Sequence, residues 1–276
     1  MKKFVCLVSD PIKFGRGHLS RQIQIQSEFR KLGYEYPIHF NKDEMDLSLL
    51  NQNSTLVLDL SNVDEEPTLE FLDNFDEVIA FDASGKYIPD RNFVVLAHPN
   101  RNYQASKYVS TGLHNLIVRS DVSVLKNTQE QIDREYFLIS LGYAASTEAY
   151  QHALRLTKDL PNIPKILASG SELEINPTSN LEVIVDAPNF IHLLARAKAV
   201  ITNGGTTYVE SLLLGKSVMS IPQTKDEQNF VNALYSLTKI DLELPGFRKI
   251  LSEEASKAGV GTDGAKRLCK IMVENS

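Results

Sequence analysis

The chain has 276 residues, enough for two domains of ordinary size, and its 42% hydrophobic and 23% charged residues are typical of a globular protein. The formal net charge of −6 argues against a general nucleic-acid-binding protein. The first apolar run, residues 4–8, is too short for the core of a signal peptide, and no stretch reaches the roughly 20 apolar residues that cross a bilayer. We therefore expect a cytoplasmic protein with no stable membrane insertion.

Short apolar runs alternate with helical segments along most of the chain. The predicted strands cover residues 4–9, 36–40, 55–60, 77–82, 93–96, 136–141, 165–168, 181–185, 199–203 and 217–221. The predicted helices cover residues 18–32, 67–74, 147–158, 189–197, 206–214 and 227–237, and two more, 244–258 and 262–274, close the chain. Several strands are continuous in Val, Ile and Leu, which is typical of parallel strands covered on both faces. Repeated βα units predict doubly wound sheets.

A change of composition predicts where the domains divide. Residues 97–135 are polar and weakly periodic, and a new βα series follows them. We therefore expect an N-terminal α/β domain over residues 1–130 and a C-terminal α/β nucleotide-binding domain over residues 131–276. Two such halves resemble the GT-B architecture, in which two Rossmann-like domains face each other across a cleft. We expect His18 and Gly205 on opposite walls of that cleft.

The first candidate site is the loop Gly15-Arg16-Gly17-His18, between the first strand and the first helix. Ligands of open α/β sheets bind beyond the carboxyl ends of strands, and two glycines let the backbone approach a ligand closely. Ser20 stands where the dinucleotide fingerprint needs Gly or Ala, which argues against NAD. The partial positive charge of the helix N-terminus disfavours a protonated His18, and a neutral imidazole can activate water or a hydroxyl. The alternative is a histidine that only caps the helix.

The second candidate site is a glycine-rich turn between a strand and a helix of the second half. Backbone N–H groups at Gly204 and Gly205, beside two threonine hydroxyls, suit a diphosphate. Glu210, one turn into the helix, can accept a bidentate hydrogen bond from a ribose diol. The alternative is a turn that holds no ligand. The candidate residues here are Asn203, Gly204, Gly205, Thr206, Thr207, Glu210, Gln228 and Asn229.

The order of these motifs resembles a known family. Gly15 to Arg21 reads Gly-x-Gly-His-x-x-Arg, and residues 204–216 read Gly-Gly-Thr-Thr-Tyr-Val-Glu-Ser-Leu-Leu-Leu-Gly-Lys. Three segments between these motifs also agree with the family: Val57-Leu58-Asp59, Ala80-Phe81-Asp82, and residues 115–121, which include Arg119. Together they resemble the UDP-sugar hydrolase of pseudaminic acid biosynthesis and the related spore-coat polysaccharide biosynthesis proteins. More distantly, they resemble the glycosyltransferase that makes lipid II.

This resemblance implies a reaction and the residues that serve it. His18 would activate water, and residues 204–210 with Gln228 would hold UDP, which enters as part of the substrate, with no separate cofactor and no metal. Gly15 and Gly17 would lie against the nucleotide sugar. The residues expected to contact the sugar are Arg16, Arg21, Asp59, Asp82 and Arg119. The family's His-Tyr after the aspartate is Leu60-Ser61 here, a departure that bears on the sugar and on the reaction.

The leading hypothesis is a metal-independent nucleotide-sugar hydrolase of surface-polysaccharide or nonulosonic-acid biosynthesis, acting as a monomer on a UDP-sugar. Water attack at the anomeric carbon would release the free sugar. One alternative is a GT-B glycosyltransferase that transfers the sugar to an acceptor, because the same base serves water and a hydroxyl. The other is a non-catalytic nucleotide-sugar binding protein.

Overall fold

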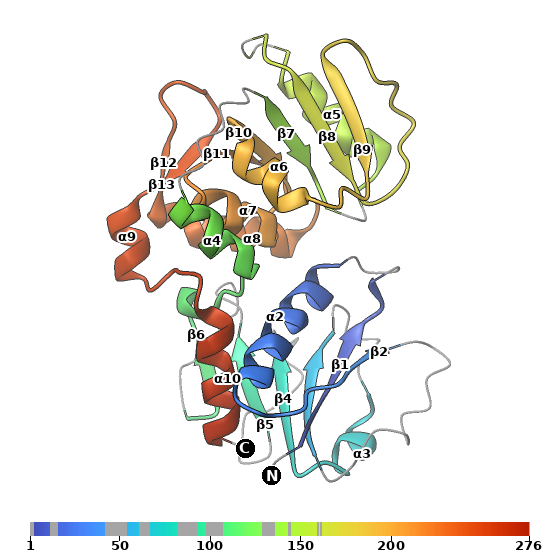
Figure 1. The fold of residues 1–276 in the computed structure, drawn as a ribbon, viewed down its shortest axis with the longest axis vertical. Helices are drawn as coiled ribbons and strands as arrows, with labels where there is room; N and C mark the ends of the chain where they lie inside the picture. Colours follow the sequence, from blue (N-terminus) through green and yellow to red (C-terminus); the bar gives the residue numbers. More distant parts are fainter. Residues whose placement is uncertain are drawn as a thin grey trace. The chain divides into compact units, whose positions relative to one another are not determined.

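The computed structural model describes residues 3–11, 16–41, 54–60, 67–81, 93–97, 107–128, 136–142, 145–158, 160 and 162–275. The chain forms two compact units, Met1–Val118 with Ala258–Ser276 and Arg119–Lys257. Each unit is built on its own mainly parallel sheet with helices, so the prediction of two Rossmann-like α/β domains is confirmed (Figure 1).

The first unit holds a fully parallel sheet in the order β2-β1-β3-β4-β5-β6. Its strands are β1 (Phe4–Ser9), β2 (Ile38–Asn41), β3 (Thr55–Asp59), β4 (Glu77–Phe81), β5 (Phe93–Ala97) and β6 (Val109–Thr111). Its helices are α2 (Gly17–Lys31), α3 (Leu69–Leu72), the 3-10 helix η3 (Leu113–Asn115) and α10 (Gly264–Asn275).

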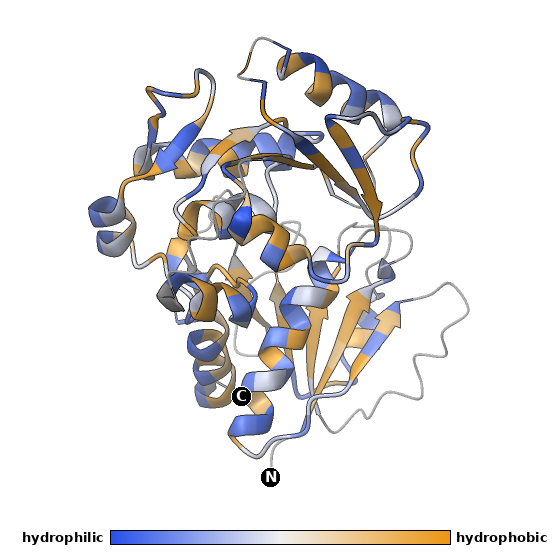
Figure 2. Cartoon of the chain, turned by 45° about the horizontal axis from the view of Figure 1, so that its top comes forward, coloured by the Kyte–Doolittle hydropathy of each residue, from blue (hydrophilic) through white to orange (hydrophobic). Residues whose placement is uncertain are grey.

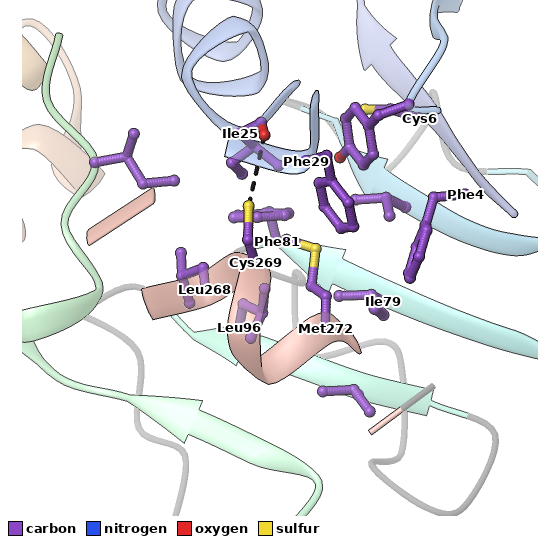
Figure 3. Close-up of a cluster of buried hydrophobic side chains, with 14 of the residues drawn as sticks. Phe4, Cys6, Ile25, Phe29, Ile79, Phe81, Leu96, Leu268, Cys269 and Met272 are labelled. Carbon is purple, nitrogen blue, oxygen red and sulfur yellow. Dashed lines mark hydrogen bonds between the residues drawn. The ribbon is translucent and has the colours of Figure 1, made fainter. Parts of the chain in front are cut away.

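The sheet of the first unit is buried on both faces. Alternate residues of β1 point to opposite sides, so Cys6 belongs to one core cluster and Leu7 to another. Helices α2 and α10 cover the first face, and the Cys269 thiol lies 3.5 Å from the carbonyl oxygen of Ile25 (Figure 3). Figure 2 shows hydrophobic residues gathered in the strands and mixed with polar ones on the helices. This double burial explains the continuous apolar runs of the sequence.

The second unit holds a sheet in the order β12-β13-β11-β10-β7-β8-β9, antiparallel only where β13 pairs with β11 and β12. Its strands are β7 (Phe137–Ser140), β8 (Lys165–Ser169), β9 (Leu181–Val185), β10 (Ala199–Thr202), β11 (Ser217–Ser220), β12 (Thr238–Ile240) and β13 (Arg248–Ile250). Its helices are α4 (Ser120–Thr128), α5 (Thr147–Leu156), α6 (Phe190–Arg196), α7 (Thr206–Leu213), α8 (Lys225–Leu234), the 3-10 helix η4 (Tyr235–Leu237) and α9 (Ser252–Lys257).

Every predicted strand is present, but the predicted helix over residues 244–258 is wrong in its first half. Only Ser252–Lys257 is helical there, and Arg248–Ile250 forms β13. Gly246 has a left-handed φ of 87°, which interrupts a helix, and the fully buried Phe247 packs against Phe137 with 6.0 Å between ring centroids. Tertiary packing thus overrides the local helical pattern. Strands β6 and β12 and helix α4 were also not predicted.

The compact units differ from the predicted division at residue 130 in two ways. The chain passes from the first unit to the second between Val118 and Arg119, and not at residue 130. It returns to the first unit at Ala258, so the last helix, α10, belongs to the first unit. Helix α10 packs on α2 because its apolar side chains, among them Leu268 and Met272, complete the first core cluster. Its first residue, Gly264, lies directly against the backbone of Leu116: an added Cβ would stand 1.9 Å from that carbonyl oxygen.

Each sheet has one point where the chain reverses its direction of winding. In the first unit β2 and β3 flank β1 on opposite sides, so the reversal lies between β1 and β3. In the second unit β8 and β10 flank β7, so the reversal lies between β7 and β10. Ligands of open α/β sheets bind at the carboxyl ends of the strands at such a point. Among the described residues, no helix is long and apolar enough to cross a membrane.

Candidate active site

His18 and Asp59 meet at the reversal point of the first sheet. Asp59 ends β3, paired in register with Val8 of β1, and His18 is the second residue of α2. The His18 Nδ1 atom lies 2.7 Å from Asp59 Oδ1, although the residues are 41 positions apart. The carboxylate of Asp59 is fully buried, whereas 24% of the His18 side chain is exposed. The buried acid therefore orients the imidazole, and part of the His18 side chain remains accessible from solvent.

Asp59 receives hydrogen bonds from three side chains of α2. Arg21 bonds both carboxylate oxygens, with Nε 2.8 Å from Oδ2 and the second contact between Nη2 and Oδ1. Gln22 Nε2 donates to Oδ2 over 2.6 Å. Arg21 and Gln22 follow His18 by three and four residues, about one helical turn, so all three side chains lie on the same side of α2. The acid is thus satisfied within the chain, and its predicted contact with the sugar stays a prediction.

The charge of Asp59 fixes the proton on His18. Burial by itself raises the pKa of Asp59, but the positive charge of Arg21 and the interactions with His18 outweigh burial and hold this pKa well below its ordinary range. An ionised carboxylate only accepts hydrogen bonds, so His18 Nδ1 must carry a hydrogen. The lone pair of a neutral ring then lies on Nε2. This arrangement supplies a base whose ring is oriented by a buried acid.

The remaining sequence-predicted residues of the first unit lie at the same end of α2 or outside the described residues. Arg16 occupies the N-cap position and Gly17 begins the helix, where an added Cβ would meet no atom within 4 Å. Arg21 also lies over the ring of Phe81, which ends β4, at 5.5 Å. Gly15 and Asp82 lie outside the described residues.

The glycine turn of the second unit lies at the reversal point between β7 and β10. Asn203 follows β10; its Nδ2 donates to Glu227 Oε1 over 2.5 Å, and its Oδ1 accepts from Gly205 N over 3.3 Å. An added Cβ on Gly204 would lie 2.7 Å from the Glu227 carbonyl oxygen, so packing against α8 requires this glycine. At Gly205 the nearest atom would be 3.6 Å away, an ordinary contact. Packing therefore explains why residue 204 is a glycine but does not explain why residue 205 is one.

Helix α7 begins immediately after this turn with an uncapped end. Gly205 is its N-cap and supplies no side chain, and the first helical residues are Thr206, which is exposed, and Thr207, which is half-buried. Backbone N–H groups at such an end attract anions. Gln228 and Asn229 lie half-buried on α8, where Gln228 donates to Asn232 over 2.9 Å.

Glu210, the predicted ribose contact, is bonded to Arg119, the predicted sugar contact. Arg119 donates from its backbone N to Glu210 Oε1 over 2.9 Å and from Nε to Oε1 and Oε2 over 3.0 and 3.1 Å, and Nη2 also contacts Oε2. The Glu210 side chain is 1% exposed. The guanidinium also lies 5.0 Å from the ring centroid of Phe190 on α6. Both carboxylate oxygens that would bind a diol therefore have partners within the chain.

Sequence reasoning missed several residues of these clusters. Gln22 was hidden on the apolar face of α2, although its spacing of four from His18 could have revealed it. Glu227 was predicted only as the first residue of a helix, and no local pattern marks Tyr36 or Phe190. In the described part of the chain, no group of three or more His, Cys, Asp and Glu side chains is placed to hold a metal ion.

Comparison with known proteins supports the fold. No protein-family model and no curated protein matches the sequence. Among solved structures, a spinosyn rhamnosyltransferase aligns over 99% of this chain and 96% of its own, with a TM-score of 0.58 and 13% identity. The same transferase complexed with thymidine diphosphate gives a TM-score of 0.55 over the same shares, with 11% identity. The UDP-GlcNAc 2-epimerase of Methanocaldococcus jannaschii, in complex with UDP-GlcNAc and UDP, covers 99% of both chains, with a TM-score of 0.53 and 9% identity.

The chain has a GT-B-like fold. At these identities the likeness concerns the fold alone, and the chemistry must be argued from the side chains.

Proposed function

We propose that this protein is a nucleotide-sugar hydrolase that uses His18 to activate water against the anomeric carbon of a UDP-sugar. The observation that carries the proposal is the His18–Asp59 pair at the carboxyl edge of the first sheet, with Nδ1 bonded to a buried acid and Nε2 left as the base. Proton transfer by a positioned histidine contributes typically about 10²–10⁴-fold to rate.

The proposed nucleotide site is the start of α7. The diphosphate would take hydrogen bonds from the backbone N–H groups at Thr206 and Thr207, assisted by the helix dipole. In this proposal the ribose diol replaces the Arg119 guanidinium on Glu210, so nucleotide binding opens the Arg119–Glu210 pair. Gln228 and Asn229 extend the polar surface on α8.

The family resemblance supports further parts of the proposal. These are a uridine nucleotide, turnover without a metal, a monomeric cytoplasmic enzyme, and a role in surface-polysaccharide or nonulosonic-acid biosynthesis. The resemblance also assigns contacts with the sugar to Arg16, Arg21, Asp82 and Arg119, and contacts with the nucleotide sugar to Gly15 and Gly17.

Glycosyl transfer to an acceptor hydroxyl is the second candidate, because the rhamnosyltransferase shares the fold and the same base would serve both reactions. A non-catalytic nucleotide-sugar binding protein is the third. These candidates differ in what they release, so isotope labelling separates them.

The test begins with a thermal-shift screen against UDP, CMP, GDP and NAD, because a ligand that binds the folded state raises its stability. UDP-sugars are then incubated in ¹⁸O-labelled water with wild type, His18→Asn and the matched control His39→Asn. We expect labelled free sugar and unlabelled UDP, a loss on the order of 10²–10⁴-fold in kcat for His18→Asn, and near-normal turnover for His39→Asn. Label in UDP, full activity of His18→Asn, or a 2-epimer without release of UDP would refute the hydrolase mechanism.

A further inference from the structure

A buried hydrogen-bonded chain runs behind His18 and continues past Asp59. Tyr36 OH donates to Gln22 Oε1 over 2.6 Å, and Gln22 Nε2 donates to Asp59 Oδ2 over 2.6 Å. Asp59 Oδ1 then accepts from His18 Nδ1 over 2.7 Å. Tyr36 is 4% exposed, and Gln22 and Asp59 are fully buried.

The direction of every bond in this chain is determined. Burial raises the pKa of Tyr36 well above its ordinary range, so the phenol keeps its hydrogen and can donate it. The ionised Asp59 can only accept, so the NH2 group of Gln22 must face it and the amide oxygen must face Tyr36. The reversed amide would place its oxygen against the carboxylate. A buried network of this kind has one satisfied arrangement.

Tyr36 is itself fixed by two further contacts with α2. Gln26 Nε2 donates to the backbone oxygen of Tyr36 over 2.7 Å, and the Tyr36 ring stacks on Phe29 at 4.7 Å with 13° between the planes. Gln22 and Gln26 are four residues apart and therefore lie on one helix face. The phenol is thus a rigid anchor for the Gln22 amide.

Gln22 and Arg21 together hold the carboxylate of Asp59 in one orientation. Arg21 bonds both carboxylate oxygens from one side and so sets the plane of the group. Gln22 fixes Oδ2 from the buried side, and this leaves Oδ1 directed at His18 Nδ1.

We propose that Gln22 and Tyr36 are positioning residues that hold Asp59 in the one rotation that keeps His18 in its Nδ1–H form. The consequence for turnover rests on the proposed function, because it needs His18 Nε2 as the base. The consequence for the tautomer does not, because it follows from the hydrogen bonds of the first unit alone.

The test is ¹⁵N NMR of the imidazole nitrogens in the full chain, which reports the tautomer directly. The chain has six histidines, and the His18 signals are those lost in His18→Asn. In wild type at a pH where the ring is neutral, we expect the Nδ1–H form to predominate. In Tyr36→Phe and Gln22→Leu we expect the ratio of Nδ1–H to Nε2–H to fall by roughly 2- to 10-fold, the net value of one hydrogen bond.

Tyr34→Phe is the matched control. Tyr34 packs against Phe4 and Phe29 in the same aromatic cluster, with centroid distances of 5.8 and 6.0 Å, and none of its contacts among the described residues joins the Asp59 network. It should leave the His18 tautomer ratio unchanged. If Gln22→Leu does not fold, Tyr36→Phe still decides the question, because it removes a single oxygen atom.

The outcomes separate this inference from the proposed function. A wild-type Nε2–H form, or a ratio that Tyr36→Phe leaves unchanged in folded protein, overturns the positioning role whatever the enzyme does. Full turnover of His18→Asn overturns the proposed function and leaves the tautomer result intact. If both stand, Tyr36→Phe should lower kcat by the same 2- to 10-fold with little change in KM.

Discussion

Replacing Arg119 with Met should destabilise the second unit strongly, because it strands the carboxylate of Glu210. In the native protein that group is 1% exposed and receives bonds from the guanidinium and from the backbone N of residue 119. Methionine keeps much of the side-chain volume and removes the charge. The backbone bond at 2.9 Å remains and compensates part of the loss.

The expected cost follows from the burial of the two partners. Removing one partner of a buried ion pair typically costs about 3–5 kcal/mol. Since the backbone bond survives and 27% of the Arg119 side chain is exposed to screening solvent, we expect a lower figure, about 2–4 kcal/mol. Glu210→Gln should cost only about 1 kcal/mol, because it strands no charge in the interior and solvent can hydrate the partly exposed guanidinium. The double variant should be more stable than Arg119→Met.

Native-state hydrogen exchange in the full chain measures the two units separately. Amides of β7 and β10 should exchange roughly 30- to 1,000-fold faster in Arg119→Met, while those of β1 and β3 in the first unit serve as the internal control. A loss below about 1 kcal/mol, or a double variant less stable than Arg119→Met, would show that the pair is not an effectively buried one.

Three further predictions concern other parts of the molecule. Gly264→Ala should destabilise the first unit by at least about 1–3 kcal/mol in urea unfolding, because its Cβ would stand 1.9 Å from the Leu116 carbonyl oxygen. Gly17→Ala is the control: Gly17 is also the first residue of a helix, but its added Cβ would meet nothing within 4 Å, so this variant should be neutral or stabilising. Because the folded-state pKa of Asp59 is depressed, its contribution to stability is present above about pH 4 and is lost as pH falls below that value, so Asp59→Asn should flatten the acid limb of a stability–pH curve; an unchanged limb would contradict this linkage. Turnover of the nucleotide sugar should survive EDTA, and a strict Mg²⁺ or Mn²⁺ requirement would reveal a metal site that the proposal lacks.

The sequence by itself determined the repeated βα order and most of the elements. Continuous apolar runs such as residues 4–8 predict strands buried on both faces, and this periodicity is a local property. The same order placed His18 at the start of a helix beyond a strand end, where α/β sheets bind ligands. These inferences needed no contact between distant residues.

Only the tertiary structure decided what the polar residues bind. The sequence predicts ligand contacts for Asp59 and Glu210 but not their partners within the chain. Packing buries both carboxylates, and a buried charge must take a partner from whichever element the fold brings near. The partners of Asp59 lie on α2, where His18 is 41 residues away from it in the sequence. The partner of Glu210 is Arg119, which is 91 residues away. The return of α10 to the first unit also depends on tertiary packing. The apolar face of an amphipathic helix indicates that this face is buried, but not against which sheet.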